Sequence, residues 1–256
     1  MRQQRNFTHQ HRPKKNLLIG GFEPITTAIQ NGEQLERIYL QDTVNSPQAG
    51  ELKKLALEFE IPVNKVPFEK LRNFNLENHQ GVIALRSKVK YQNLQDIISF
   101  VVENGETPLF LLLDGITDIR NIGGIARTAY CCGVHAIIIP EKGVGALNED
   151  AITTSAGALE NIAICRVKTL HSAVEDLHLN GIKVYASEMT ATENVFEVNF
   201  SEPCAVIMGS EDKGIHPSLY TICDGKFKIP MQKDFESLNV SVATGMILYE
   251  AMKQRL

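Results

Sequence analysis

Six apolar runs in the second half of the chain constrain its fold more than any other feature. The runs are PLFLLLD, AIIIP, AICRV, IKVYAS, CAVIMGS and KFKIP, and stretches with helical spacing separate them. Strands buried on both faces of a sheet are continuously apolar, and parallel strands require crossover connections. The sequence therefore predicts an α/β fold with a parallel sheet over residues 108–256.

The amino-terminal part alternates short helices and strands. GFEPITTAIQNG has apolar residues at helical spacing and ends in Gly, and SPQAGELKKLALEFE has a Ser-Pro helix start. FEKLRNF reads as a short helix, and RIYLQ, IPVNKVP and GVIALRS read as strands. We expect a small α/β domain over 16–88, then a linker helix over 89–107, because that segment ends near Gly and Pro.

Composition excludes several classes of protein. None of the apolar runs in the 256 residues approaches the roughly 20 residues that span a bilayer, and no apolar segment follows the basic amino terminus as it would in a signal peptide. The five cysteines lack CxxC and zinc-ligand spacing, so we expect reduced core thiols and not a catalytic cysteine. These features predict a soluble, cytoplasmic protein without a metal site.

Charge is distributed unevenly along the chain. The first fifteen residues carry +5 and no acid, whereas the rest carries −9, for a net charge of −4. A basic flexible arm over 1–15 fits contact with RNA phosphates, because bound Lys and Arg release condensed counterions. A disordered leader that aids solubility is the alternative.

Three segments after predicted strands carry polar residues where the carboxyl ends of parallel strands form a ligand crevice. In LLLDGITDIRNIGGIARTAYCCGV we expect a turn at Asn121 and the pair Gly123 and Gly124, then a helix over 125–132 with Arg127 in its first turns. A cation there opposes the helix dipole and favours an external anion, although a plain surface arginine is the alternative. The chain contains neither a dinucleotide GxGxxG after its first strand nor a GxxxxGK[ST] loop.

The other two segments are AVIMGSEDKGI and FKIPMQKDFESLNVSVATG. In the first, Gly209 follows a buried strand and allows close approach of the backbone to a ligand, with Glu211 two residues further on. In the second, a polar loop with Ser237 and Asn239 precedes the last helix. Helix capping is the alternative role of these two side chains.

Together the segments resemble the three signature motifs of the SpoU (TrmH-like) family of RNA 2′-O-ribose methyltransferases. Motif one, D-x-V-x-D-P-x-N-x-G followed by Arg and Ala, reads DGITDIRNIGGIARTA here, with Ile119 in place of Pro. Motif two, G-S/N-E-x-x-G, reads GSEDKG, and motif three reads IPM followed by SLNVSVA. TTSAGALE also resembles the family's S-x-GA-x-E segment.

The resemblance implies a fold and partners. It implies a trefoil-knotted parallel-sheet methyltransferase domain, a homodimer, and S-adenosylmethionine as cofactor, with no metal and no membrane. GFEPITTAIQNG and NHQGVIAL resemble the ribosomal-protein-like, substrate-recognition domain of the branch that methylates guanosine in large-subunit ribosomal RNA. We therefore expect RNA as the substrate, with transfer RNA as the alternative to ribosomal RNA.

The resemblance also implies roles for single residues. The cofactor-binding positions are Ser187, Gly209, Ile229, Met231 and Leu238. The catalytic positions are Arg127, Asn121, Glu211, Ser237 and Asn239, of which the last four would orient Arg127 and the ribose. Two rivals stay open, a knotted methyltransferase acting on guanine N1 and a non-catalytic RNA-binding relative. SLNV and NxG with Arg127 argue against the first, and the presence of all five catalytic positions together argues against the second.

Overall fold

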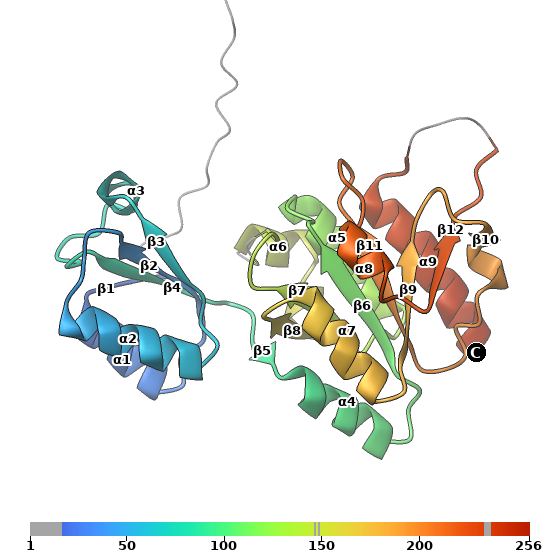
Figure 1. Cartoon of the computed structure of the whole chain (residues 1–256), viewed down its shortest axis with the longest axis horizontal. Coiled ribbons are helices and arrows are strands. Elements are labelled where there is room, and N and C mark those ends of the chain that lie inside the picture. Colours follow the sequence, from blue (N-terminus) through green and yellow to red (C-terminus); the bar gives the residue numbers. More distant parts are fainter. Residues whose placement is uncertain (1–16, 146, 148, 233–236) are drawn as a thin grey trace, which may run out of the picture. The chain divides into compact units, whose positions relative to one another are not determined.

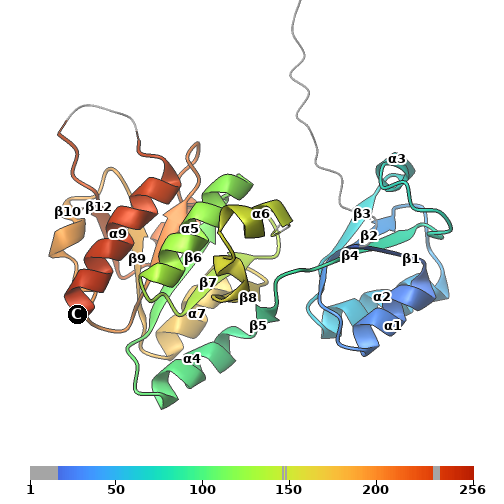
Figure 2. The same ribbon diagram turned by 180° about the vertical axis from the view of Figure 1, so that it is seen from behind.

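The structure is a computed structural model that describes residues 17–145, 147, 149–232 and 237–256. The predicted basic arm, residues 1–15, lies outside the described residues. The chain divides into two compact units, Met1–Ser87 and Lys88–Leu256. Figure 1 and Figure 2 show the elements of each unit from opposite sides.

The first unit is a four-stranded mixed sheet with two helices packed on one face. The sheet order is β1-β4-β2-β3, in which β4 is antiparallel to β1 and β2, and β3 is parallel to β2. The helices bury Ile25, Ile29 and Leu52 against Ile38 and Leu40 of β2. The elements are β1 (Leu18–Gly20), α1 (Phe22–Gln30), β2 (Leu35–Gln41), α2 (Pro47–Glu58), β3 (Val63–Val66), α3 (Phe68–Arg72) and β4 (Val82–Arg86).

The second unit contains an eight-stranded parallel sheet, as the apolar runs predict. Its order is β10-β12-β9-β11-β6-β7-β8-β5, and every neighbouring pair is parallel. The strands are β5 (Tyr91–Gln92), β6 (Leu109–Asp114), β7 (Ala136–Pro140), β8 (Ala163–Val167), β9 (Lys183–Ser187), β10 (Glu193–Asn194), β11 (Cys204–Gly209) and β12 (Gly225–Lys228).

Helices cover both faces of this sheet, which explains why its central strands are continuously apolar. Leu111 and Leu113 of β6 belong to the core that α5 and α9 close, whereas Phe110 and Leu112 face the core under α4 and α7. The two layers are visible on opposite sides of the sheet in Figure 1 and Figure 2. The helical elements are α4 (Leu94–Glu103), α5 (Ile119–Cys131), α6 (Glu149–Thr154), η2 (Ala158–Glu160), α7 (Leu170–Leu179), η3 (Val195–Glu197), α8 (Pro217–Tyr220) and α9 (Val240–Arg255).

The segment 89–107 differs from the linker that the sequence suggested. Its helix is present as α4, but Leu94, Ile98 and Val101 are buried, and β5 extends the sheet by pairing with β8. Val89 is 2% exposed in the core of the second unit. Packing of this apolar face makes the segment an integral part of the second unit, and the Gly-Pro signal marks only the end of α4.

Within the described part of the chain, no helix combines the length and apolar character needed to cross a bilayer.

Candidate functional site

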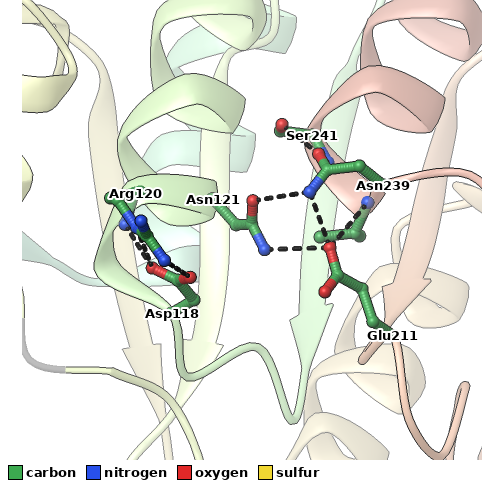
Figure 3. A network of polar contacts seen from close by, with 7 residues as sticks. Asp118, Arg120, Asn121, Glu211, Asn239 and Ser241 are labelled. Atoms are coloured by element: carbon green, nitrogen blue, oxygen red, sulfur yellow. Dashed lines mark hydrogen bonds and ion pairs between the residues drawn. The ribbon is translucent and has the colours of Figure 1, made fainter.

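The three motif segments meet at the carboxyl edge of the parallel sheet. β6 and β11 are neighbours, and their last residues, Asp114 and Gly209, are paired in register. α5 follows β6 and packs against α9, which begins within the third motif. Figure 3 shows side chains from α5, from the turn after β11 and from the start of α9 pointing toward one another. The fold therefore brings together sequence segments that lie up to 118 residues apart, the separation of Asn121 and Asn239.

A closed polar cluster connects these segments. Glu211 Oε1 accepts hydrogen bonds from Asn121 Nδ2 (3.0 Å), Asn239 Nδ2 (2.7 Å) and the backbone N–H of Val240 (3.2 Å). Asn239 Nδ2 also donates to Asn121 Oδ1 at 3.0 Å, as Figure 3 shows. Because one carboxylate oxygen collects three donors, each partner fixes the orientation of the others. The structure thus brings together three of the five residues predicted to be catalytic.

Asn239 combines two roles that the sequence presented as alternatives. Its Oδ1 caps α9 by accepting from the backbone N–H groups of Ser241 (3.0 Å) and Val242 (3.4 Å). Its Nδ2 group remains free for Glu211 and Asn121. The cap fixes the side chain at the start of the helix and thereby aims its amide into the cluster.

The start of α5 explains why Ile119 replaces the family's proline without loss of the turn. Asp118 is the N-cap, and its carboxylate accepts the backbone N–H of Arg120 at 2.9 Å. Ile119 occupies the first helical position, where proline is favoured but not required. The Arg120 guanidinium also pairs with Asp118 at 3.0 Å (Figure 3), and hydrogen bonds from Arg120 lower the pKa of that carboxyl group.

The prediction of a turn at Asn121, Gly123 and Gly124 is wrong, because α5 already begins at Ile119. Both glycines lie inside the helix for reasons of packing. A Cβ at Gly123 would lie 2.6 Å from Thr154 Cβ, and one at Gly124 would lie 3.4 Å from Ser241 Cβ. The paired glycines, which look like a turn in the sequence, let α6 and the start of α9 approach α5 closely.

Arg127 consequently lies in the third turn of α5, beyond the first turn where the helix dipole acts. The helix dipole therefore does not disfavour a cation at this position, contrary to the expectation from the sequence. The side chain is exposed and has no hydrogen bond or ion pair to any residue that the structure describes. Ser237 is likewise exposed and outside the polar cluster. We expected the other four residues to orient Arg127, but none of them forms a direct hydrogen bond with it among the described residues.

A pocket of about 280 Å³ adjoins the polar cluster. Four of the five predicted cofactor-binding residues, Ser187, Gly209, Ile229 and Leu238, line it, and Met231 does not. Glu211 and Ser237 also line the pocket, so Glu211 belongs to both the pocket and the polar cluster. The remaining lining residues are Glu188, Met189, Thr190, Met208, Ser210, Gly214, Tyr220, Lys228, Val240 and Ala243.

Sequence reasoning missed the segment Glu188–Thr190 and Tyr220. The position of this segment directly after β9 could have indicated that it lines the pocket, because ligand pockets form at the carboxyl ends of parallel strands. Tyr220 carries no such signal, because it lies at the end of a four-residue helix six residues beyond the second motif, which ends at Gly214. Its position becomes evident only in three dimensions.

Gly209 permits a close approach of backbone to backbone within the chain, where the sequence suggested an approach to a ligand. A Cβ at Gly209 would lie 2.2 Å from the carbonyl carbon of Gly214 and 2.3 Å from the backbone nitrogen of Ile215. The turn after β11 therefore folds back directly over Gly209. Even an alanine would displace this backbone, so the glycine shapes the pocket wall independently of its contact with a ligand.

The cysteines are free thiols, but not all are core residues. Cys165 and Cys204 are buried, whereas Cys131 is exposed and the other two are half-buried. Burial raises the pKa of Cys165 to about 12 and that of Cys223 to about 11, so both thiols remain protonated at neutral pH. Among the residues described, no group of His, Cys, Asp and Glu side chains is placed to hold a metal ion.

This fold and site define a class, the parallel α/β proteins with a ligand pocket at the carboxyl edge of the sheet. The sequence over residues 108–249 matches the SpoU rRNA Methylase family, and residues 18–92 match the family described as RNA 2′-O ribose methyltransferase substrate binding. The chain belongs to the SpoU methyltransferase family.

Individual relatives agree with this assignment. The chain is 32% identical to YacO of Bacillus subtilis (strain 168), assigned by name to the TrmH family of tRNA/rRNA methyltransferases, over 92% of this chain and 94% of YacO. It is 38% identical to the 23S rRNA (guanosine-2′-O-)-methyltransferase RlmB of Vibrio parahaemolyticus over 70% of this chain and 72% of that protein. The SpoU methyltransferase AviRb from Streptomyces viridochromogenes, solved with AdoMet, superposes with a TM-score of 0.59 at 25% identity, covering 93% of this chain and 90% of AviRb.

Proposed function

We propose that this protein transfers the methyl group of S-adenosylmethionine to a ribose 2′-hydroxyl of RNA, and that its target is a guanosine in large-subunit ribosomal RNA. The observation that carries the proposal is the position of Glu211. This residue lines the pocket and also binds Asn121 and Asn239, so the polar cluster lies at the edge of the pocket. A methyl donor in the pocket and a ribose at the cluster would then be neighbours.

The pocket residues fit this cofactor. Ile229, Leu238, Val240 and Ala243 offer apolar surface for an adenine ring. Two acidic residues, Glu188 and Glu211, line the same space against one basic residue, Lys228, and this balance favours a ligand with a positive sulfonium centre. When bound, S-adenosylmethionine supplies the electrophilic methyl group. By resemblance to the family, Gly209, Ile229 and Leu238 hold it largely through backbone groups, with Ser187 as a further contact. The assignment of Met231 rests on the resemblance alone, because Met231 does not line the pocket.

The attacking hydroxyl must lose its proton near the transition state. Arg127 is a permanent cation, because a guanidinium has a pKa above about 12, and it is therefore a poor proton acceptor. Its exposed guanidinium, without a partner in the described chain, is available to a phosphate and to the ribose oxygen. We assign Arg127 to holding the RNA and stabilising the developing negative charge. Asn121, Glu211, Ser237 and Asn239 are assigned to the ribose side of the site.

The assignment to ribosomal RNA is supported by the guanosine-specific name of RlmB and by the substrate-binding match over residues 18–92. A transfer RNA target is the second candidate, because the name of YacO includes both tRNA and rRNA. Mapping 2′-O-methyl sites in total RNA from a deletion strain and its parent distinguishes the two. Loss of one guanosine site in large-subunit RNA supports the proposal, and loss of a transfer RNA site replaces it with the second candidate.

Two structural features of the family are part of this proposal. One is a trefoil knot in the second unit. It is supported by the path of the chain, which leaves β11, turns back over Gly209 and adds β12 on the far side of β9. The other is a homodimer, supported by an exposed apolar stripe on α9 made of Val242, Met246 and Tyr249.

A further inference from the structure

The turn that carries Glu211 is short and is closed by hydrogen bonds between its own residues. Ser210 and Gly214 exchange backbone hydrogen bonds of 3.2 and 2.9 Å, and the Ser210 hydroxyl accepts the N–H of Lys213 at 3.2 Å. These bonds determine the shape of the turn, residues 210–216, but they do not attach it to the rest of the unit. Its position relative to the sheet must depend on contacts outside the turn.

Asp114 provides one such contact. It is the last residue of β6, and its Oδ2 accepts the backbone N–H of His216 at 2.6 Å. The two residues are 102 positions apart in the sequence. A hydrogen bond to an ionised carboxylate is stronger than one between neutral groups. Asp114 therefore ties the end of the turn to the central strand, next to Gly209 at the beginning of the turn.

Tyr220 provides a second contact from α8. Its hydroxyl lies against the backbone of the turn, since a Cβ at Gly214 would be 3.6 Å from Tyr220 Oη. Lys226 Nζ lies over the Tyr220 ring, 4.6 Å from its centroid, at the distance of a cation–π contact. Burial raises the pKa of Tyr220, and the nearby backbone N–H of Ile215 opposes this shift. The phenol is thus a neutral partner of the turn at physiological pH.

The turn contributes to both halves of the site. Ser210, Glu211 and Gly214 of the turn line the pocket, and Glu211 also accepts the hydrogen bonds that join the polar cluster. We propose that Asp114 and Tyr220 are positioning residues that hold the 210–216 turn and thereby keep the cofactor pocket aligned with the polar cluster. This inference rests on the proposed function for the identity of the cofactor. The structure alone supplies the contacts.

The chain offers a matched control for Asp114. Asp224 Oδ2 also accepts a backbone N–H, that of Val184, at 2.7 Å, but Asp224 does not line the pocket. We expect Asp114→Ala to raise the Kd for S-adenosylmethionine at least tenfold in calorimetric titration and to lower kcat at saturating cofactor. Asp114→Asn keeps an oxygen acceptor and should recover part of both losses. Asp224→Ala should change Kd by less than twofold.

Tyr220 has a control in Tyr185, which is also a half-buried phenol and is absent from the pocket lining. Tyr220→Phe keeps the ring over Lys226 and removes only the hydroxyl, and we expect a threefold to tenfold rise in the Kd for S-adenosylmethionine. Tyr185→Phe should leave that Kd within twofold of the parent. Each change removes a single oxygen atom. We therefore expect both variants to fold, so that a change in Kd reports on the missing hydroxyl.

Hydrogen exchange of the protein without cofactor supplies a readout independent of activity. Exchange across residues 210–216 should accelerate at least fivefold in Asp114→Ala and remain unchanged in Asp224→Ala. The inference is overturned if Asp114→Ala and Tyr220→Phe fold, exchange like the parent over this turn, and bind S-adenosylmethionine within twofold of the parent. If the parent binds the cofactor but methylates no RNA, the proposed function fails, while the binding and exchange comparisons still test the role of Asp114 and Tyr220.

Discussion

At the scale of single residues, a substitution at Arg127 should affect methyl transfer without affecting cofactor binding. It does not line the pocket and has no partner in the described part of the chain, so its loss should leave the pocket intact. We expect Arg127→Ala to lower kcat/KM for methyl transfer at least a hundredfold and to change the Kd for S-adenosylmethionine less than twofold. Arg127→Lys should also be poor, because an ammonium cannot reproduce the planar fork of a guanidinium.

Arg120 is the matched control for this experiment, because it is an exposed arginine on the same helix with its charge paired to Asp118. Labelled-methyl incorporation into ribosomal RNA should fall much less in Arg120→Ala than in Arg127→Ala. If the folded Arg127→Ala protein stays within about threefold of the parent, a change below 1 kcal/mol in barrier, Arg127 has no catalytic role.

Ala156 has a backbone conformation that is unfavourable for a residue with a side chain. Its φ is 51°, and the next residue, Gly157, is also left-handed with φ 84°. This conformation disfavours any residue with a Cβ. We expect Ala156→Gly to raise the free energy of unfolding by up to about 1 kcal/mol, measured by chemical denaturation. Ala158→Gly, at a buried position in the adjoining 3-10 helix, should lower it instead. Equal effects from both changes would contradict backbone strain at Ala156.

At the scale of elements, hydrophobic patterning could predict the central strands and most helices, because their apolar periodicity is set by burial. It could not find β5 or β10, which have two residues each and too little sequence for a period. It also placed the start of α5 six residues late, because Gly123 and Gly124 mark turns in most contexts but here serve helix packing. The motifs could indicate which residues approach one another, but not that Glu211 is the shared acceptor or that Arg127 lies outside the cluster.

Arg255 attaches the carboxy-terminal end of α9 to neighbouring segments. The hydrophobic pattern of the sequence does not distinguish it from an ordinary surface arginine. Arg255 donates to the backbone oxygens of Phe200 (2.7 Å), Thr107 (2.6 Å), Pro108 (3.0 Å) and Glu202 (2.9 Å). It thereby joins the last helix to the segments that precede β6 and β11. We expect Arg255→Ala to lower the free energy of unfolding by roughly 2–3 kcal/mol, because charged donors are lost from several carbonyl groups.

Thermal unfolding followed by circular dichroism measures this loss. Arg255→Lys should be intermediate, since an ammonium cannot satisfy four acceptors spread around a planar fork. Lys253→Ala is the control on the same helix, because Lys253 pairs only with Glu250 on the surface of the described structure. A midpoint for Arg255→Ala that matches the Lys253→Ala midpoint would show that the four hydrogen bonds do not stabilise the unit.

At the scale of the whole molecule, α9 is apolar on two sides. One side buries Ile247, Leu248 and Ala251 in the core. The other exposes Val242, Met246 and Tyr249 to the extent of 54%, 47% and 60%. These three positions recur at helical spacing and form one stripe. A contiguous apolar stripe of this kind is typical of an interface between protein chains, and the proposed homodimer would cover it.

We therefore expect sedimentation equilibrium to give the mass of two chains for the parent and of one chain for Met246→Glu, because a dimer would bury the new carboxylate without a partner. Leu57→Glu is the control, since Leu57 is 81% exposed on α2 in the first unit and should leave the mass unchanged. Circular dichroism must show both variants folded. A parent protein that sediments as one chain at the concentrations used for methyl transfer would remove the dimer from the proposal. A Met246→Glu protein that remains dimeric would move the interface away from this face of α9.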